Sequence, residues 1–235
     1  MRQLFRQLIL IIAAVYSGFV LAQAAPELPV KSYILIDAAS GQILLSKNPN
    51  EKLPPASITK LMTAYLVVEA LENGKLTPDT PITVSQNAYK QEGSRMFIEV
   101  NKQVLVQDLL QGLIIQSGND AAVALAEYLG GSMDGFTEMM NRKAAQLGMK
   151  DTHYTNPTGL PDPKNYTTAE DIAILSRHLL AKLARDSGYP QAQLTPKALR
   201  KLENYDFPGN VRELENILER ALTFVEGNMI EAEDI

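Results

Sequence analysis

The chain has 235 residues, of which 46% are hydrophobic and 21% are charged, so it can bury a core and is not a disordered chain. Its formal net charge of -5 gives no global attraction for nucleic acid or anionic lipid. The sequence contains no cysteine, which excludes disulfides, thiolate catalysis and cysteine-ligated zinc.

The first residues have the pattern of a secretory signal. Arg2 and Arg6 precede an apolar run from Leu8 to Leu21, and Ala22-Gln23-Ala24 supplies the small residues that a signal peptidase recognises. We therefore expect residues 1–24 to be a signal peptide, cleaved after Ala24, and the mature protein to be periplasmic. The alternative is an uncleaved membrane anchor, although the apolar run is short for a span.

The next segment predicts a hairpin followed by a helix. Residues 32–37 and 42–46 are short apolar stretches on either side of Ala39-Ser40-Gly41, which is typical of a β-hairpin, here expected to pack on helices. Pro54-Pro55 then interrupts the chain, and Ser57 is expected to begin a helix that runs to about Leu71. Because Ile58 and most later positions of this helix are apolar, we expect it to be nearly all buried.

Ser57 and Lys60 lie three residues apart in this predicted helix. That spacing places them on one face, so the amine can accept the proton of the hydroxyl. Taken alone, S-x-x-K is a weak signal, because many copies are a helix start with a solvated lysine. A second motif, Ser117-Gly118-Asn119, follows at the end of the helix predicted over 106–114, and this pairing is typical of penicillin-binding enzymes.

The remaining helices of this region follow from apolar spacing and capping residues. Helices are predicted over 121–129 and 133–147, the second one ended by Gly148. Residues 155–160 are expected to be a loop, and Thr167 with Glu170 predicts a capping box that begins a helix through Leu180. The fold class expected is therefore α/β and rich in helix.

On these motifs, residues from about 30 to 182 resemble the N-terminal part of a low-molecular-mass penicillin-binding protein. That family, peptidase S11, consists of serine-type D-Ala-D-Ala carboxypeptidases. The resemblance implies a β-lactamase/transpeptidase-like domain over residues 25–182. The segments that carry it stand in the family's order: Pro55 to Thr63, Ser94 to Phe97, Ser117 to Ala121, and Leu147 to His153.

The resemblance also implies a role for four residues. Ser57 would be the nucleophile that forms an acyl-enzyme with the penultimate D-alanine, and Lys60 would be its general base. Ser117 would relay a proton toward the leaving D-alanine, and Asn119 would hydrogen-bond the peptide stem. The implied partners are peptidoglycan stem peptides ending in D-Ala-D-Ala and β-lactams. We expect no cofactor and no metal, since the two histidines, at 153 and 178, lie far apart in the sequence.

The sequence departs from the family at its third motif. In the family, a K-T-G strand beside the serine binds the substrate carboxylate and contributes to the oxyanion site, and no Lys-Thr-Gly occurs in this sequence. We therefore expect a truncated domain with an exposed two-stranded hairpin and impaired catalysis.

Residues 183–235 are different in character and predict a small helical subdomain. Thr195-Pro196 is expected to begin one helix, while Asn210 as N-cap, with Glu213, begins another that Gly227 ends. The segment from Tyr205 to Asn216 resembles the C-terminal lid of the AAA+ domain in sigma-54-dependent transcription activators.

In that activator family, an arginine at the position of Arg212 senses the nucleotide. The sequence has no GxxxxGK phosphate loop, so we expect no ATP binding and no nucleic-acid binding here. We interpret Arg212 as a surface residue that pairs with Glu215 or Glu219.

Two hypotheses about function remain open. The first is an exported serine carboxypeptidase-like protein of peptidoglycan metabolism that keeps the Ser57–Lys60 pair. The second is a non-enzymatic, transcription-regulator-like chimera in the cytoplasm, or a gene fusion without function. Cell fractionation with analysis of signal cleavage separates them.

Overall fold

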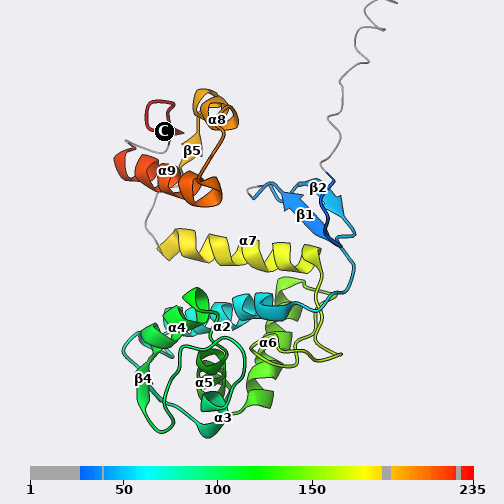
Figure 1. Cartoon of the computed structure of the whole chain (residues 1–235), viewed down its shortest axis with the longest axis vertical. Helices are drawn as coiled ribbons and strands as arrows, with labels where there is room; N and C mark the ends of the chain where they lie inside the picture. Colours follow the sequence, from blue (N-terminus) through cyan, green and yellow to red (C-terminus); the bar gives the residue numbers. More distant parts are fainter. Residues whose placement is uncertain (1–26, 39, 187–191, 226–228) are drawn as a thin grey trace, which may run out of the picture. The chain divides into compact units, whose positions relative to one another are not determined.

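The structure is a computed structural model that describes residues 27–38, 40–186, 192–225 and 229–235 (Figure 1). The expected signal peptide, residues 1–24, lies outside this range. The chain divides into two compact units, residues 1–48 and 49–235. The fold is α/β and rich in helix, as the sequence predicts.

The first unit contains the predicted hairpin. Strand β1 (Tyr33–Ile36) pairs antiparallel with β2 (Ile43–Lys47), with a bulge after Leu35. The turn is stabilised by Asp37, whose carboxylate accepts hydrogen bonds from the backbone and the hydroxyl of Ser40, both at 2.6 Å. The hairpin of the sequence analysis is therefore confirmed.

The second unit begins with a helical body. Its elements in chain order are the 3-10 turn η1 (Ala56–Thr59), α2 (Lys60–Glu72), β3 (Pro81–Thr83), α3 (Gln86–Tyr89), β4 (Gln103–Leu105), α4 (Val106–Ile115), α5 (Asn119–Gly130), α6 (Met133–Leu147) and α7 (Ala169–Asp186). Strands β3 and β4 pair antiparallel. Helix α2 packs against α4, α5, α6 and α7, so it is the central element of this body (Figure 1).

Helix α2 is buried because it contributes to two clusters of the core. Val67 packs in a cluster with residues of α4 and α5, while Met62 and Leu66 pack in a second cluster with residues of α6 and α7. Each such side chain stabilises the fold by about 1.5–3 kcal/mol on burial. The predicted burial is thus confirmed for α2, except that Ile58 lies in η1 and is half exposed.

The predicted end of α6 is confirmed, and the predicted ends of α7 differ from those in the structure. Helix α6 ends as expected, with Gly148 in the left-handed region at φ 86°. The predicted cap of α7 is wrong by one residue, because it is the Thr168 hydroxyl that accepts from the backbone N–H of Asp171 at 3.1 Å. The hydroxyl of Thr167 lies 2.7 Å from that of Thr152 instead. Helix α7 also extends six residues beyond the predicted Leu180.

The C-terminal segment contains α8 (Pro196–Glu203) and α9 (Asn210–Phe224), with β5 (Gln193–Leu194) parallel to β6 (Met229–Ile230). Thr195 caps α8 as predicted. The prediction that Asn210 caps the next helix is wrong, since Gly209 holds that position and its N–H donates to the Glu213 carboxylate at 2.8 Å. Gly227 lies outside the described residues.

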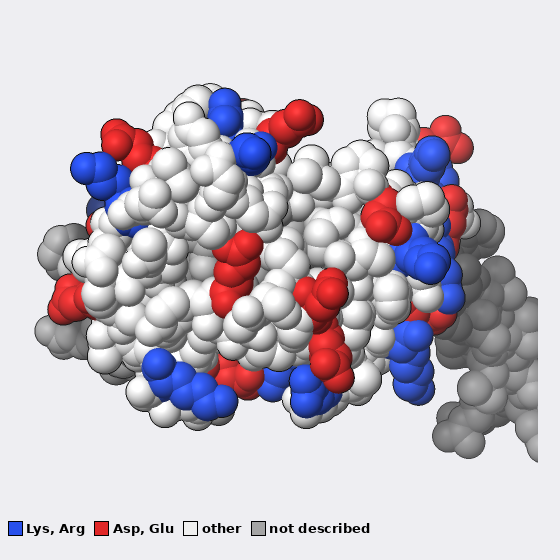
Figure 2. All heavy atoms as spheres, turned by 90° about the horizontal axis from the view of Figure 1, so that it is seen from below, with Lys and Arg blue, Asp and Glu red and all other residues white. Residues whose placement is uncertain are grey.

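The predicted ion pair of Arg212 is also wrong. Arg212 is exposed, and within the described residues no carboxylate of Glu215 or Glu219 lies in ion-pair contact with it. The charged side chains are mixed on the face of the molecule that Figure 2 shows. Basic and acidic side chains are interspersed there, so their fields partly cancel. None of the helices in the described ranges is long and apolar enough to cross a membrane.

Candidate active site

Ser57 and Lys60 are in direct contact. The Lys60 Nζ lies 3.1 Å from the Ser57 Oγ. The prediction that Ser57 begins the long helix is wrong in detail, because α2 starts at Lys60 and Ser57 lies in η1. Residues three apart in a 3-10 turn are eclipsed, which keeps the two side chains on one side. The hydroxyl can therefore pass its proton to the amine without a change of backbone.

Lys60 is buried, with only 5% of its surface exposed, whereas Ser57 is exposed. Its Nζ also donates a hydrogen bond to the Thr158 carbonyl at 2.8 Å. Burial disfavours the charged form and lowers the pKa of Lys60 from 10.5 to about 8. The amine is therefore closer to serving as a base near neutral pH than a solvated lysine is.

The Thr158 carbonyl, which accepts the hydrogen bond of the Lys60 Nζ, belongs to the predicted loop over 155–160. The Thr63 hydroxyl of α2 donates to the Pro157 carbonyl at 2.8 Å, which fixes this loop on the helix. Gly159 has φ 81°, and a Cβ added there would lie 1.7 Å from the Ala56 carbonyl oxygen. Only glycine lets the loop approach the turn of Ser57 this closely.

Ser117 lies between α4 and α5, at the helix end that the sequence predicts. Its φ of 55° places it in the left-handed region, and so does the φ of 47° at Ala56, next to Ser57. Such strained non-glycine residues cost about 1–3 kcal/mol and cluster at functional sites. Both serine-bearing turns are thus strained.

Asn119 is the first residue of α5 and is buried. Its side-chain amide donates to the Glu92 carbonyl, and its backbone N–H donates to the Ser94 carbonyl at 2.7 Å. Within the described residues, neither Asn119 nor Ser117 is hydrogen-bonded to Ser57 or Lys60, although α4 and α5 both pack on α2. The structure therefore brings the first pair into contact, and the hydrogen bonds of the described residues do not join the second motif to it.

Asp120 is a residue of the site region to which the sequence analysis assigned no role. Its buried carboxylate accepts backbone hydrogen bonds from Met96, Phe97 and Ile98 at 2.8–3.3 Å, and from Ala121 at 2.9 Å. Four donors satisfy a charge that would otherwise be costly to bury. Asp120 thus attaches the segment over 96–98 to the start of α5, and no local pattern reveals partners more than twenty residues away.

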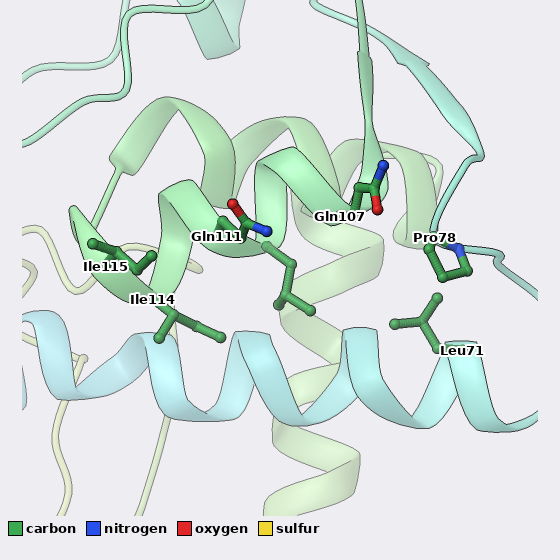
Figure 3. Close-up of a pocket in the computed structure, with 7 residues that line it drawn as sticks. Leu71, Pro78, Gln107, Gln111, Ile114 and Ile115 are labelled. Carbon is green, nitrogen blue, oxygen red and sulfur yellow. The ribbon is translucent and has the colours of Figure 1, made fainter. Parts of the chain in front are cut away.

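Two hollows lie near these elements, and neither is lined by the four candidate residues. An apolar groove of about 300 Å³ lies between α2 and α4, lined by Leu71, Pro78 and α4 residues that include Ile114 and Ile115 (Figure 3). A more open hollow of about 510 Å³ is lined by Pro54, Pro161 and Tyr166, among others. Among the described residues, no group of three His, Asp or Glu side chains could hold a metal ion.

The fold and the contact between Ser57 and a buried lysine one turn away are typical of one class, the proteins with an active-site serine and a neighbouring lysine. Residues 20–205 match the D-alanyl-D-alanine carboxypeptidase family, peptidase S11. The chain therefore belongs to that family. The match includes part of the segment after residue 182.

Named relatives and solved structures agree with this assignment. The chain is 42% identical over 164 residues to D-alanyl-D-alanine carboxypeptidase DacA of Haemophilus influenzae, covering 68% of this chain and 42% of that protein. It is 44% identical over 150 residues to DacF of Bacillus subtilis, covering 64% and 39%. The structure of penicillin-binding protein 5 from Haemophilus influenzae is 39% identical, with a TM-score of 0.67 over 74% of this chain and 52% of that one. The chain thus spans about 40% of the length of these two curated relatives.

Proposed function

We propose that this chain is a serine carboxypeptidase-like protein of peptidoglycan metabolism that is acylated at Ser57. The proposed substrates are stem peptides ending in D-Ala-D-Ala, and a β-lactam would acylate the same serine. One observation carries the proposal: the buried Lys60 Nζ lies 3.1 Å from the Ser57 Oγ and is anchored on the Thr158 carbonyl. The names of the relatives, carboxypeptidases and a penicillin-binding protein, support it.

In the proposed reaction, the neutral amine of Lys60 accepts the Ser57 proton while the Oγ attacks the carbonyl carbon of the penultimate D-alanine. The C–N bond to the terminal D-alanine breaks, and its nitrogen receives a proton relayed through Ser117. A water molecule then hydrolyses the ester on Ser57. Asn119 would bind the peptide stem; this role rests on the motif it shares with the family, and its side-chain amide would have to leave the Glu92 carbonyl.

We expect the proposed catalysis to be impaired in this chain, because its 235 residues contain no K-T-G segment to bind the substrate carboxylate. Loss of a single oxyanion donor typically lowers the rate about a hundred- to a thousand-fold. We expect purified protein to release D-alanine from a D-Ala-D-Ala peptide at the rate of its Ser57→Ala variant, which defines the background. Release as fast as that of an intact family member, assayed in parallel, would contradict this expectation.

For the compartment, we propose export to the periplasm. The support is the pattern of Arg2, Arg6 and the apolar run that follows, together with relatives that are named as carboxypeptidases. The mature chain would begin at Ala25, and an uncleaved signal would leave the protein at the membrane. Mass spectrometry of protein recovered from cells decides between these forms.

For residues 183–235, we propose a helical fragment similar to the AAA+ lid of sigma-54-dependent activators, without nucleotide binding. The support is the sequence from Tyr205 to Asn216 and its arrangement as a turn followed by α9. A regulator-like role in the cytoplasm would require the signal peptide to fail. The domain division proposed is 1–24, 25–182 and 183–235.

A further inference from the structure

The loop that holds Lys60 is organised by one side chain, that of Asn156. Its Oδ1 accepts hydrogen bonds from the Thr158 N–H at 3.2 Å, the Thr158 hydroxyl at 2.9 Å and the Gly159 N–H at 2.7 Å. Its Nδ2 donates to the Leu160 carbonyl at 3.1 Å. An asparagine can do this because its side chain carries an acceptor and two donors. One residue thus sets the conformation of the three residues from 158 to 160.

This conformation fixes the carbonyl on which Lys60 is anchored. Thr158 is buried, with 3% of its surface exposed, and its carbonyl oxygen lies 2.8 Å from the Lys60 Nζ. The preceding carbonyl, of Pro157, is held by the Thr63 hydroxyl. The Thr158 carbonyl is therefore fixed by Asn156 on one side and by α2 on the other.

The direction of this carbonyl matters because a neutral amine has one lone pair and two hydrogens. When one N–H points at the Thr158 oxygen, the lone pair can face the Ser57 hydroxyl, which is 3.1 Å away. A carbonyl that moves would leave the amine free to rotate and would admit water beside it. Orientation of a base in this way is part of its catalytic contribution.

The lowered pKa of Lys60 has burial as its cause. Four acidic groups on α2 and on the elements packed against it have other partners in the described residues. These are Glu69 with Lys143, Glu72 with Lys182, Asp120 with backbone amides, and Asp171 with the backbone N–H of Asp151 and the Thr152 hydroxyl.

We propose that Asn156 is a positioning residue for Lys60, acting through the Thr158 carbonyl. The inference rests on the proposed role of Lys60 as the base of the acylation step. Asn156 itself touches neither the serine nor the lysine in the hydrogen-bond network of the described residues. Replacing Asn156 should therefore change the protonation of the Lys60 amine and not merely the stability of the fold.

The test compares Asn156→Ala with Asn141→Ala in the full chain. Asn141 is a matched control, because its side chain also bonds backbone groups, the N–H and carbonyl of Tyr154, each at 2.8 Å. Two quantities are measured from pH 6 to 10: the rate of acylation by a fluorescent penicillin, and the chemical shift of the ¹³C-labelled Lys60 Cε, assigned with Lys60→Arg. Thermal unfolding of each variant reports stability.

In Asn156→Ala we expect acylation at pH 7 to fall at least tenfold and the midpoint of the Lys60 titration to rise by one pH unit or more. The midpoint rises because water reaches the amine and favours its charged form. In Asn141→Ala the rate should stay within twofold of that of the unsubstituted chain. The titration midpoint should be unchanged, although the melting temperature falls. Asn156→Asp keeps the acceptor oxygen for Thr158 and Gly159, loses the donor to the Leu160 carbonyl and adds a negative charge. It should therefore recover part of the plateau rate, above its own raised midpoint.

Equal behaviour of Asn156→Ala and Asn141→Ala in rate and midpoint would overturn the proposal. If the unsubstituted chain is not acylated at all, the proposed function fails, and the Lys60 titration alone decides the role of Asn156. An unshifted midpoint in Asn156→Ala would then reject it.

Discussion

Lys60 determines how acylation should depend on pH. Burial lowers the pKa of Lys60 to about 8, and only the neutral amine can accept the serine proton. Below that pKa, the neutral fraction falls about tenfold for each pH unit, so about one tenth is neutral at pH 7. We predict that penicillin acylation rises about tenfold per unit from pH 6 to pH 7 and levels off above pH 8 to 9.

Rates of labelling by a fluorescent penicillin across this range check the prediction. Lys60→Met should remain unlabelled at every pH, because methionine fills much of the same space without a base. A profile that is flat from pH 6 to 9 would show that another group takes the proton.

At the same scale, the sequence identifies some residues of the site and misses others. Ser57 and Lys60 are predicted because their spacing places them on one face and because the Ser117-Gly118-Asn119 motif follows. Asp120 and Asn156 are missed because their hydrogen bonds go to backbone groups, which leave no pattern in the side-chain letters. The only local signal at Asn156 is the Asn-Pro-Thr-Gly sequence, which is typical of a turn built on an asparagine side chain.

At the level of the elements, η1 and the loop over 156–160 are in contact so close that a side chain at Gly159 has no room. We predict that Gly159→Ala lowers the free energy of unfolding by more than about 3 kcal/mol, because strain at φ 81° adds to a clash with the Ala56 carbonyl. Gly148→Ala is the control, since its φ of 86° is similar but nothing lies within 4 Å of an added Cβ.

The control should cost about 1 kcal/mol, the price of the left-handed conformation alone. Urea unfolding of both variants measures the difference, and penicillin labelling should be lost only in Gly159→Ala. Equal stabilities of the two variants would mean that the loop is not packed on η1 as described.

Element boundaries show where sequence reasoning stops being accurate. The helices over 106–114 and 133–147 are predicted well because apolar spacing and Gly148 determine them. The caps at Thr167 and Asn210 are each wrong by one residue. At α7 the hydroxyl of the neighbouring Thr168 accepts from a free N–H of the first turn. At α9 the capping position is Gly209, which has no side chain and whose own N–H donates to Glu213. The start of α2 is misplaced because apolar letters do not distinguish a 3-10 turn from a helix.

For the molecule as a whole, the C-terminal segment should not bind nucleotide. Affinity for ATP in the AAA+ fold, which we propose as the origin of this segment, comes from backbone N–H groups of a phosphate loop, and the sequence contains no GxxxxGK motif. Arg212 is exposed, and one such charge contributes at most about 1 kcal/mol, against roughly 6–8 for binding at micromolar to tens of micromolar levels.

We therefore predict a flat calorimetric titration with Mg-ATP, unchanged in Arg212→Ala. Saturable micromolar binding that Arg212→Ala abolishes would revive the regulator hypothesis.

We propose above all that Ser57 is the acylated residue of this family member. The most direct measurement is mass spectrometry of tryptic peptides after the full chain is incubated with a penicillin at pH 8. We predict one penicillin adduct, on the peptide that carries Ser57, and none in Ser57→Ala. An adduct of equal yield in Ser57→Ala, or on a peptide that lacks Ser57, would contradict it.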